Sequence, residues 1–349
     1  MSDVVWGTLI GIYPFLSGMA TGSLILAALI ELLEWRKLRE LTLFSLIISW
    51  ALLIAAVTAL FIHLGIPLRA FYIFIHPQLS SPMVYGVYSW LLLFILLTAT
   101  IVIYNWYTDR PWFKTASRYL LLINMVLAII FSSYSGFLFG SIKGVELWSS
   151  PLTPISFLTS AVLSGAAVVT LLYVVVWRLT KTSIKHEILN TLGVIILIVL
   201  IASLFIQVIE LLVKAKISTA SWPATYTALT SQLAVSFIGL QFLLGGVVPL
   251  VALLLGSVRK SDIGMLVIAL LVLIGALAYK WNTVIGGQLV EEALSGVYAV
   301  TSYTPPLTGE DSILWAIGVL IWGVFLIALG LVVFPKWRVM GGTEGGARS

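Results

Sequence analysis

Nine long apolar runs constrain this chain more than any other feature of its sequence. Each has about 20 or more mainly apolar residues, which as a helix matches the hydrocarbon core of a bilayer. Charged residues make up only 9% of the chain, against about 25% in soluble domains. We therefore predict an all-α integral membrane protein with nine transmembrane helices, at residues 6–33, 41–64, 83–107, 116–141, 152–177, 188–213, 227–256, 262–280 and 312–335.

The basic residues predict how these helices are oriented, because Lys and Arg concentrate in cytoplasmic loops. Of the 19 Lys and Arg residues, 14 follow odd-numbered helices, including those in the tail after the ninth. The N-terminus is therefore expected outside and the C-terminus inside. This bias accounts for the net charge of +5 without a nucleic-acid partner. The other five basic residues are expected in outside connectors: Arg69, Lys143, Lys214, Lys216 and Lys280.

The scarcity of metal ligands limits the redox chemistry of the chain. It has no cysteine, so it is not expected to hold an iron–sulfur cluster, which needs thiolate ligands. A haem with two histidine ligands is not expected either, because His186 falls inside while His63 and His76 fall outside. We expect no metal site in this chain.

An internal similarity suggests how the helices are grouped. YPFLSGMATGSLILAALI in the first helix resembles ISFLTSAVLSGAAVVTLL in the fifth. Small residues at helical spacing also arise simply because they let membrane helices approach closely, and that alternative stays open. A duplication would give a first four-helix bundle at 1–142 and a second at 143–283. A long outside loop, the ninth helix and the tail follow at 284–349.

Polar side chains from several helices are expected to meet near the outer side of the membrane. Tyr13 and Ser17 lie on one face of the first helix, since residues four apart are neighbours. The connector at 65–82 adds Arg69 to this region. Apolar walls with a few donors and a histidine suit an amphipathic ring such as a quinone. The other residues of this candidate site are His63, Tyr134, Ser135, Gln207 and Glu210.

Each of these residues also has a simpler interpretation. Tyr13 and Tyr134 suit the aromatic belt at a membrane interface, and Arg69 suits a side chain that reaches lipid phosphates. Glu210 stands four residues before Lys214, the favourable order for a helical ion pair. Gln207 and Glu210 are candidates for proton handling.

Three stretches resemble the NrfD/PsrC family, the quinone-reactive membrane subunits of prokaryotic oxidoreductase complexes. They are YPFLSGMATGS at 13–23, HLGIPLRAFYIFIHPQLSSPM at 63–83 and SYSGFLFGS at 133–141, with a shorter match in VIGGQ at 284–288. Ile66 stands where the family usually has arginine, and His76 where it usually has asparagine.

The resemblance implies a prokaryotic cell-membrane protein that binds menaquinol or a similar quinone at the outer side of the first bundle. It implies no haem, cluster or metal in this chain. Its partners would be a ferredoxin-like iron–sulfur subunit on the extracytoplasmic side and a molybdopterin or hydrogenase catalytic subunit. By position, the resemblance carries over Tyr13, Ser17, His63, Arg69 and Tyr134. Our hypothesis for their roles is that Tyr134 and His63 hydrogen-bond the two quinone oxygens and that Arg69 stabilises negative charge on the ring.

Two other functions remain open from the sequence. A redox-inert anchor for an extracytoplasmic enzyme would have similar partners and no quinone site. A secondary transporter would need interrupted helices near the middle of the membrane. GGVVP at 245–249 is one such interruption, but the spans carry little charge at mid-depth.

Overall fold

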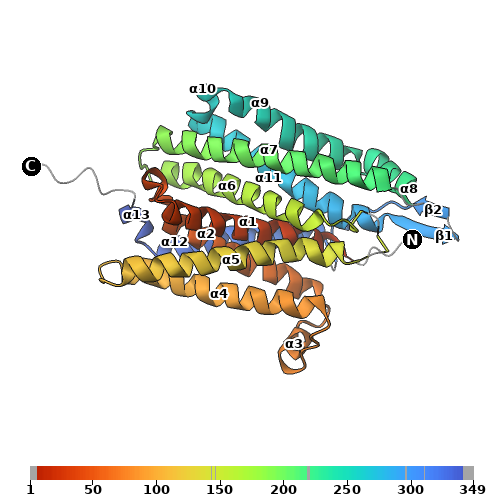
Figure 1. Ribbon diagram of the computed structural model, residues 1–349, viewed down its shortest axis with the longest axis horizontal. Coiled ribbons are helices and arrows are strands. Elements are labelled where there is room, and N and C mark those ends of the chain that lie inside the picture. Colours follow the sequence, from red (N-terminus) through yellow and green to blue (C-terminus); the bar gives the residue numbers. More distant parts are fainter. Residues whose placement is uncertain are drawn as a thin grey trace, which may run out of the picture.

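The computed structural model describes residues 6–142, 144–145, 147–217, 221–294, 297–309 and 311–340. In that part of the protein, nine helical spans are long and apolar enough to cross a membrane, which confirms the predicted class (Figure 1). They are α1 (Thr8–Leu32), α2 (Leu41–His63), α4 (Pro82–Trp106), α5 (Phe113–Gly140), α6 (Thr153–Leu179), α7 (His186–Ile217), the joined η4 (Val235–Val247) and α9 (Val248–Leu254), α11 (Asp262–Val284) and α12 (Ile313–Val333).

Short elements connect the spans. On one side of the molecule they are η1 (Arg36–Leu38), α10 (Gly256–Arg259) and α13 (Trp337–Met340). On the other they are η2 (Pro67–Phe71), α3 (Tyr72–Ile75), α8 (Trp222–Thr227), η3 (Ala228–Gln232), η5 (Gly286–Gln288) and the antiparallel hairpin of β1 (Val290–Leu294) and β2 (Val297–Val300). We name these the inner and outer ends, following the orientation predicted from the basic residues.

The centre of the fold is the contact between α1 and α6, the two helices that carry the similar stretches. A Cβ on Gly22 or Gly165 would overlap the backbone of the opposite helix, so only glycine permits this approach. Gly18 adds a looser contact, since its Cβ would lie 3.6 Å from Ala161. Small residues therefore bring two long helices together here, where lipid offers no hydrophobic driving force for their association.

The other spans pack around this pair. Helices α2 and α5 contact α1, and α4 contacts α5 and α2; α7 and α11 contact α6, and η4 contacts α11. Figure 1 shows the first four spans in its lower half and α6, α7, α9 and α11 in its upper half, while α12 packs on α2. These contacts agree with two four-helix bundles and one added helix. The boundaries at 142/143 and 283/284 remain our proposal.

The seventh span contains an unusual wide helix. Residues Val235–Val247 form π-helical turns, which are rare in proteins and often mark functional or strained sites. Gly245 packs against Gly275 of α11 so closely that a Cβ on either would overlap the other. The GGVVP interruption is thus helical: α9 continues from it, with Pro249 at its start.

Three of the basic residues predicted in outside connectors, Lys214, Lys216 and Lys280, lie in membrane-spanning helices. Helix α7 extends to Ile217 and α11 to Val284, beyond the predicted ends at 213 and 280. Lys214 and Lys280 are therefore buried, with 7% and 2% of their surfaces exposed. Lys214 and Lys280 were expected in connectors because a charged residue usually ends an apolar run. Both are buried because partners within the protein stabilise their charges, and the sequence does not reveal those partners. Lys143 lies outside the described residues.

Candidate functional site

The predicted hydroxyl residues of α1 and α5 come together at the outer end. Ser135 of α5 is buried, and the Tyr13 hydroxyl of α1 faces both Ser135 and Tyr134. Ser17, also buried, lies one turn from Tyr13. The i, i+4 spacing of Tyr13 and Ser17 and the contact between α1 and α5 produce this cluster. We call Tyr13, Ser17, Tyr134 and Ser135 the hydroxyl cluster.

A glycine of α4 positions Tyr134. The Tyr134 hydroxyl lies against the backbone of Gly86, and a Cβ there would lie 2.6 Å from the hydroxyl oxygen. The Phe131 ring stacks against the Tyr134 ring, with the two ring centroids 6.5 Å apart. Tyr134 therefore occupies a fixed place between α4 and α5. Gly86 was not identified from the sequence, because a single glycine in an apolar run gives no signal of what lies against it.

His63 ends α2 and lies beside an acidic residue that the sequence analysis missed. Its Nδ1 is 3.5 Å from Oδ2 of Asp311, without hydrogen-bond geometry. Oδ1 of Asp311 accepts a hydrogen bond of 2.5 Å from the backbone N–H of Leu9. Asp311 therefore links the start of α1 to the end of α2. The separation of Leu9 and Asp311 by 302 positions explains why no sequence pattern indicated the contact.

The long outer loop holds the start of α1 at further points. The side chain of Gln288 accepts from the Trp6 N–H at 3.0 Å and donates to the Trp6 carbonyl at 2.9 Å. The Tyr303 hydroxyl lies 3.5 Å from the Thr8 hydroxyl, and burial raises the pKa of Tyr303 above its ordinary value. The VIGGQ stretch thus acts here through Gln288, which fixes the backbone next to the candidate site.

The connector that carries Arg69 does not cover the hydroxyl cluster. Elements η2 and α3 project from the bundle beyond α4 (Figure 1), and their contacts are with the ends of α2 and α4. Phe71 contacts Phe61 at 6.0 Å, and Phe74 contacts Tyr88 at 5.6 Å between ring centroids. The Arg69 side chain makes no hydrogen bond or ion pair with any described residue. The expected placement of Arg69 on the cluster is therefore not observed, and its role in binding stays a prediction.

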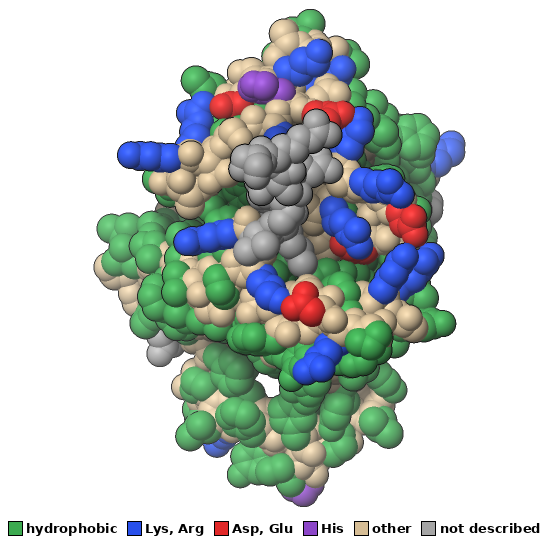
Figure 2. Space-filling view, turned by 90° about the vertical axis from the view of Figure 1, so that its left-hand side faces the viewer, with side chains coloured by type: hydrophobic (Ala, Val, Ile, Leu, Met, Phe, Trp, Pro, Cys, Tyr) green, Lys and Arg blue, Asp and Glu red, His purple; other side chains and the backbone are tan. Residues whose placement is uncertain are grey.

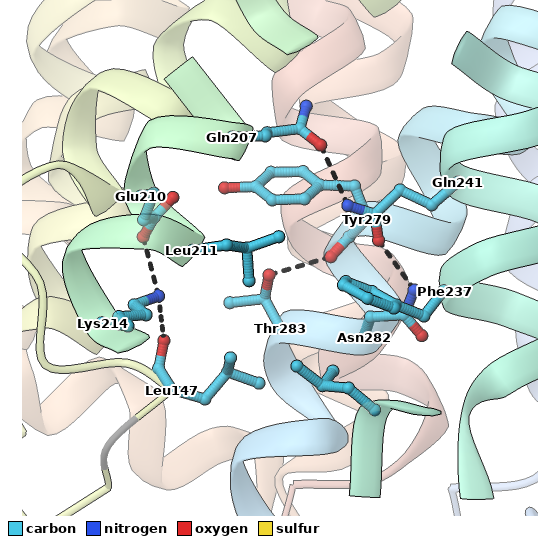
Figure 3. A pocket seen from close by; sticks show the side chains of 11 residues that line it. Leu147, Gln207, Glu210, Leu211, Lys214, Phe237, Gln241, Tyr279, Asn282 and Thr283 are labelled. Atoms are coloured by element: carbon cyan, nitrogen blue, oxygen red, sulfur yellow. Dashed lines mark hydrogen bonds and ion pairs between the residues drawn. The ribbon is translucent and has the colours of Figure 1, made fainter. Parts of the chain in front are cut away.

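Glu210 belongs to a separate cluster in the second bundle. Its carboxylate accepts hydrogen bonds from Thr153 at 2.8 Å and Ser156 at 2.6 Å, both on α6. Lys214 pairs with it at 2.9 Å and donates to the Leu147 carbonyl at 2.6 Å (Figure 3). The predicted helical ion pair of Glu210 and Lys214 is confirmed. No hydrogen bond joins it to the hydroxyl cluster among the described residues.

Gln207 belongs to a series of buried amides next to this ion pair. Asn282 of α11 donates to Gln241 at 2.8 Å, and Gln241 donates to Gln207 at 2.9 Å (Figure 3). Gln207 in turn donates to Ser203 at 2.9 Å. Ser236 donates to Asn282 at 2.6 Å. Gln241 lies in the π-helical segment, so the wide turns carry the link between α7 and α11. The adjoining cavity of about 30 Å³ is large enough for water but not for a quinone ring.

Lys280 is the second buried cation of this region. Its ammonium lies 3.3 Å from the centroid of the Phe157 ring and 5.1 Å from that of Tyr279. Glu210 lies near enough to act on it electrostatically. A cation over an aromatic face is stabilised by the quadrupole of the ring, most strongly where water is excluded. The two lysines, the carboxylate and the aromatic faces thus form one compact charged cluster.

Comparisons with known proteins identify the family. The protein belongs to the NrfD family: the model of the family described as polysulphide reductase, NrfD, matches residues 1–292. A selenate reductase subunit of Mesobacillus selenatarsenatis is 23% identical, over 97% of this chain and 88% of that protein. Protein NrfD of Escherichia coli is 28% identical over 48% of this chain and 58% of its own length. The Hdr-like menaquinol oxidoreductase integral membrane subunit of Archaeoglobus fulgidus is 23% identical over 55% of this chain and 47% of its own length.

The family and the fold together define an integral membrane subunit of an oxidoreductase complex. The described residues contain no group of three or more His, Asp or Glu side chains that could hold a metal ion. They do contain hydroxyl and imidazole donors at one end of the first bundle. Those side chains fit the oxygens of a quinone, because such a ring needs two placed hydrogen-bond partners and otherwise apolar walls.

Proposed function

We propose that this protein binds a menaquinone-type quinone at the outer end of α1, α2 and α5. There it exchanges electrons between the quinone and an iron–sulfur partner subunit on the extracytoplasmic side. The observation that carries the proposal is the hydroxyl cluster, where Tyr13, Ser135 and Tyr134 face one another beside a glycine that positions the Tyr134 ring. The name of the Archaeoglobus relative includes menaquinol, which supports this class of quinone.

The residues of this end have distinct parts in the proposed reaction. A quinone when bound supplies a carrier of two electrons and two protons. Tyr134 would hydrogen-bond one ring oxygen, and His63 the other or a water next to it. Asp311 faces the His63 imidazole at 3.5 Å, so the pair is placed to pass a proton between the ring and the outside. Arg69 would contribute only if its connector moves toward the cluster.

The electrons need a partner protein. The sequence contains no cysteine, so thiolate-held clusters must lie in another subunit. The catalytic subunit at the far end would be of the molybdopterin or hydrogenase type, as the family resemblance implies. The tasks of this membrane subunit would then be to bind and orient the ring and to handle its protons.

Quinone-linked electron transfer by the intact complex tests this proposal. Tyr134→Phe removes one hydroxyl and keeps the ring, so we expect turnover to fall about tenfold or more, within the range of a lost proton-transfer or hydrogen-bonding group. Tyr119→Phe is the matched control, because Tyr119 lies on the same helix and is exposed. Equal turnover in both variants, with the partners still attached, would remove Tyr134 from the proposed mechanism.

A further inference from the structure

A cavity of about 230 Å³ opens at the inner end of the first bundle, opposite the proposed quinone site. It lies between the last turn of α1, element η1, the end of α4 and the first turns of α5. Figure 2 looks onto this end of the molecule and shows Lys and Arg side chains gathered there. The charged residues that line the cavity are four cations and two carboxylates: Arg36, Arg39, Lys114, Arg118, Glu31 and Glu34.

The charges in this cavity do not balance. Arg39 lies 3.3 Å from Glu31, which also accepts a hydrogen bond of 3.1 Å from Thr42. Glu34 lies 3.9 Å from Arg118. The side chains of Arg36 and Lys114 make no hydrogen bond or ion pair with any described residue. Two cations therefore remain available to an anion.

The first turn of α5 adds to the positive potential. This helix has 28 residues, its N-cap residue Trp112 provides no side-chain hydrogen bond, and no acidic residue lies in the first turn. The Phe113 N–H donates to the Arg110 carbonyl at 3.0 Å. The next N–H groups of this helix end, together with the helix dipole, favour an anion, and phosphate in particular. The first two residues of α5, Phe113 and Lys114, line the cavity. The helix end and the unpaired cations thus favour the same kind of ligand at the same place.

The floor of the cavity is apolar. Ile30 and Tyr104 are nearly fully buried, and Tyr104 packs edge-on against Phe113 with their ring centroids 5.2 Å apart. Trp35 completes this surface. A free inorganic anion gains nothing from apolar walls, whereas the glycerol and upper acyl carbons of a lipid gain contact with them. The combination of an apolar floor and a basic rim therefore suits an amphipathic anion.

We propose that this cavity binds the phosphate headgroup of an anionic phospholipid from the adjoining leaflet. Arg36, Lys114 and the first turn of α5 would hold the phosphate, while Arg118 exchanges between it and Glu34. Basic pockets between membrane helices are known to accept such headgroups. The bound lipid would join the inner ends of α1, α4 and α5. This inference is independent of the proposed quinone function.

The test is a thermal-unfolding titration of the purified full-length protein after delipidation in a neutral detergent. The added probes are dioctanoyl phosphatidylglycerol, dioctanoyl phosphatidylcholine and inorganic phosphate. The test variant is Arg36→Gln/Lys114→Gln. The matched control is Lys181→Gln/Lys260→Gln, which removes two exposed cations from the same end but outside the cavity. Arg36→Lys/Lys114→Arg keeps the charge and should keep the binding.

In the parent we expect phosphatidylglycerol to raise the melting temperature at concentrations at which the other two probes do not. Each cation near an anionic lipid contributes about fivefold in affinity, so the double Gln variant should bind about thirtyfold more weakly, and the control should match the parent. An equal response to phosphatidylcholine would overturn the proposal. So would unchanged affinity in the double Gln variant. A full response to inorganic phosphate alone would show a free-anion site and reject the lipid. If the Gln variant does not fold, the selectivity of the parent decides.

Discussion

The two polar clusters of this protein differ in how completely their members are paired. In the second bundle, the Glu210 carboxylate receives three hydrogen bonds and each amide of the neighbouring series bonds to the next. At the outer end of the first bundle, His63 Nδ1 is buried without a hydrogen-bond partner. Among the described residues, the Tyr13 hydroxyl faces Ser135 and Tyr134, and the Tyr134 hydroxyl faces the Gly86 backbone.

This difference distinguishes a structural cluster from a binding site. A buried polar network in which every member is satisfied rigidifies the helices it joins. Groups that retain hydrogen-bonding capacity can use it for a ligand, and an unpaired buried polar atom requires an explanation. We therefore assign the cluster around Glu210 mainly to holding α6, α7, η4 and α11 together. The hydroxyl cluster with His63 is the better candidate for the quinone.

Removing the Glu210 carboxylate should have the largest effect on stability. Glu210→Ala leaves the buried Lys214 ammonium without its counter-ion, and breaking such a pair costs about 3–5 kcal/mol. We expect a sharp loss of melting temperature and of purified protein. The control is Glu187→Ala, which breaks an exposed ion pair with Lys37 worth at most about 1 kcal/mol. If the two variants melt alike while only Glu210→Ala loses turnover, the cluster is functional and our distinction is wrong.

Displacing Tyr134 without altering it should affect activity more than stability. In Gly86→Ala the new methyl group would occupy the place of the Tyr134 hydroxyl and ring. We expect quinone turnover to fall about tenfold, as when a hydrogen bond to the transition state is misplaced. Gly318→Ala is the matched control, because no atom lies within 4 Å of the position its Cβ would take. Normal turnover in Gly86→Ala would show that the observed position of Tyr134 is not needed.

Neutralising Asp311 should have the smallest effect. Asn keeps an oxygen for the Leu9 N–H and tolerates the positive φ of 55° at this position, but it loses the charge facing His63. A partly exposed pair of this kind contributes up to about 1 kcal/mol, so we expect Asp311→Asn to lower turnover about two- to fivefold at unchanged melting temperature.

Asp311→Ala tests the two contacts of this residue together. This variant also removes the hydrogen bond to α1. Its free energy of unfolding should be about 1 kcal/mol lower than that of Asp311→Asn, so it should melt at a lower temperature. If Asn and Ala lower turnover equally and neither changes the melting temperature, the link to α1 contributes nothing to stability.

Much of the architecture could be predicted from the sequence because its signals are local. The nine spans follow from apolar length alone. The order of the helices predicted Tyr13 and Tyr134 near the same side of the membrane, and their side chains lie at the same end of the first four spans. The internal similarity indicated α1 and α6, and these two helices form the central contact of the fold.

The features that could not be predicted depend on contacts between distant parts of the sequence. Asp311 reaches Leu9 from the far end of a long loop, and no local sequence pattern pairs two residues 302 positions apart. The burial of Lys280 depends on Phe157 of another helix. Gln207 and Glu210 were expected beside the hydroxyl cluster because the order of the helices predicts the depth of a residue in the membrane. It does not predict which neighbouring helix the residue faces, and both side chains face the second bundle. The connector with Arg69 was expected on the site because its composition is polar, but composition does not fix its direction.

The most direct test of the quinone assignment is a fluorescence-quench titration with the quinol analogue heptyl-hydroxyquinoline N-oxide on the intact complex. The parent and Tyr119→Phe should both show saturable quenching with the same affinity. Tyr13→Phe/Tyr134→Phe should bind at least about tenfold more weakly, as expected when hydrogen bonds to the bound ring are lost. Saturable quenching of equal affinity in all three proteins would place the quinone elsewhere and contradict the account.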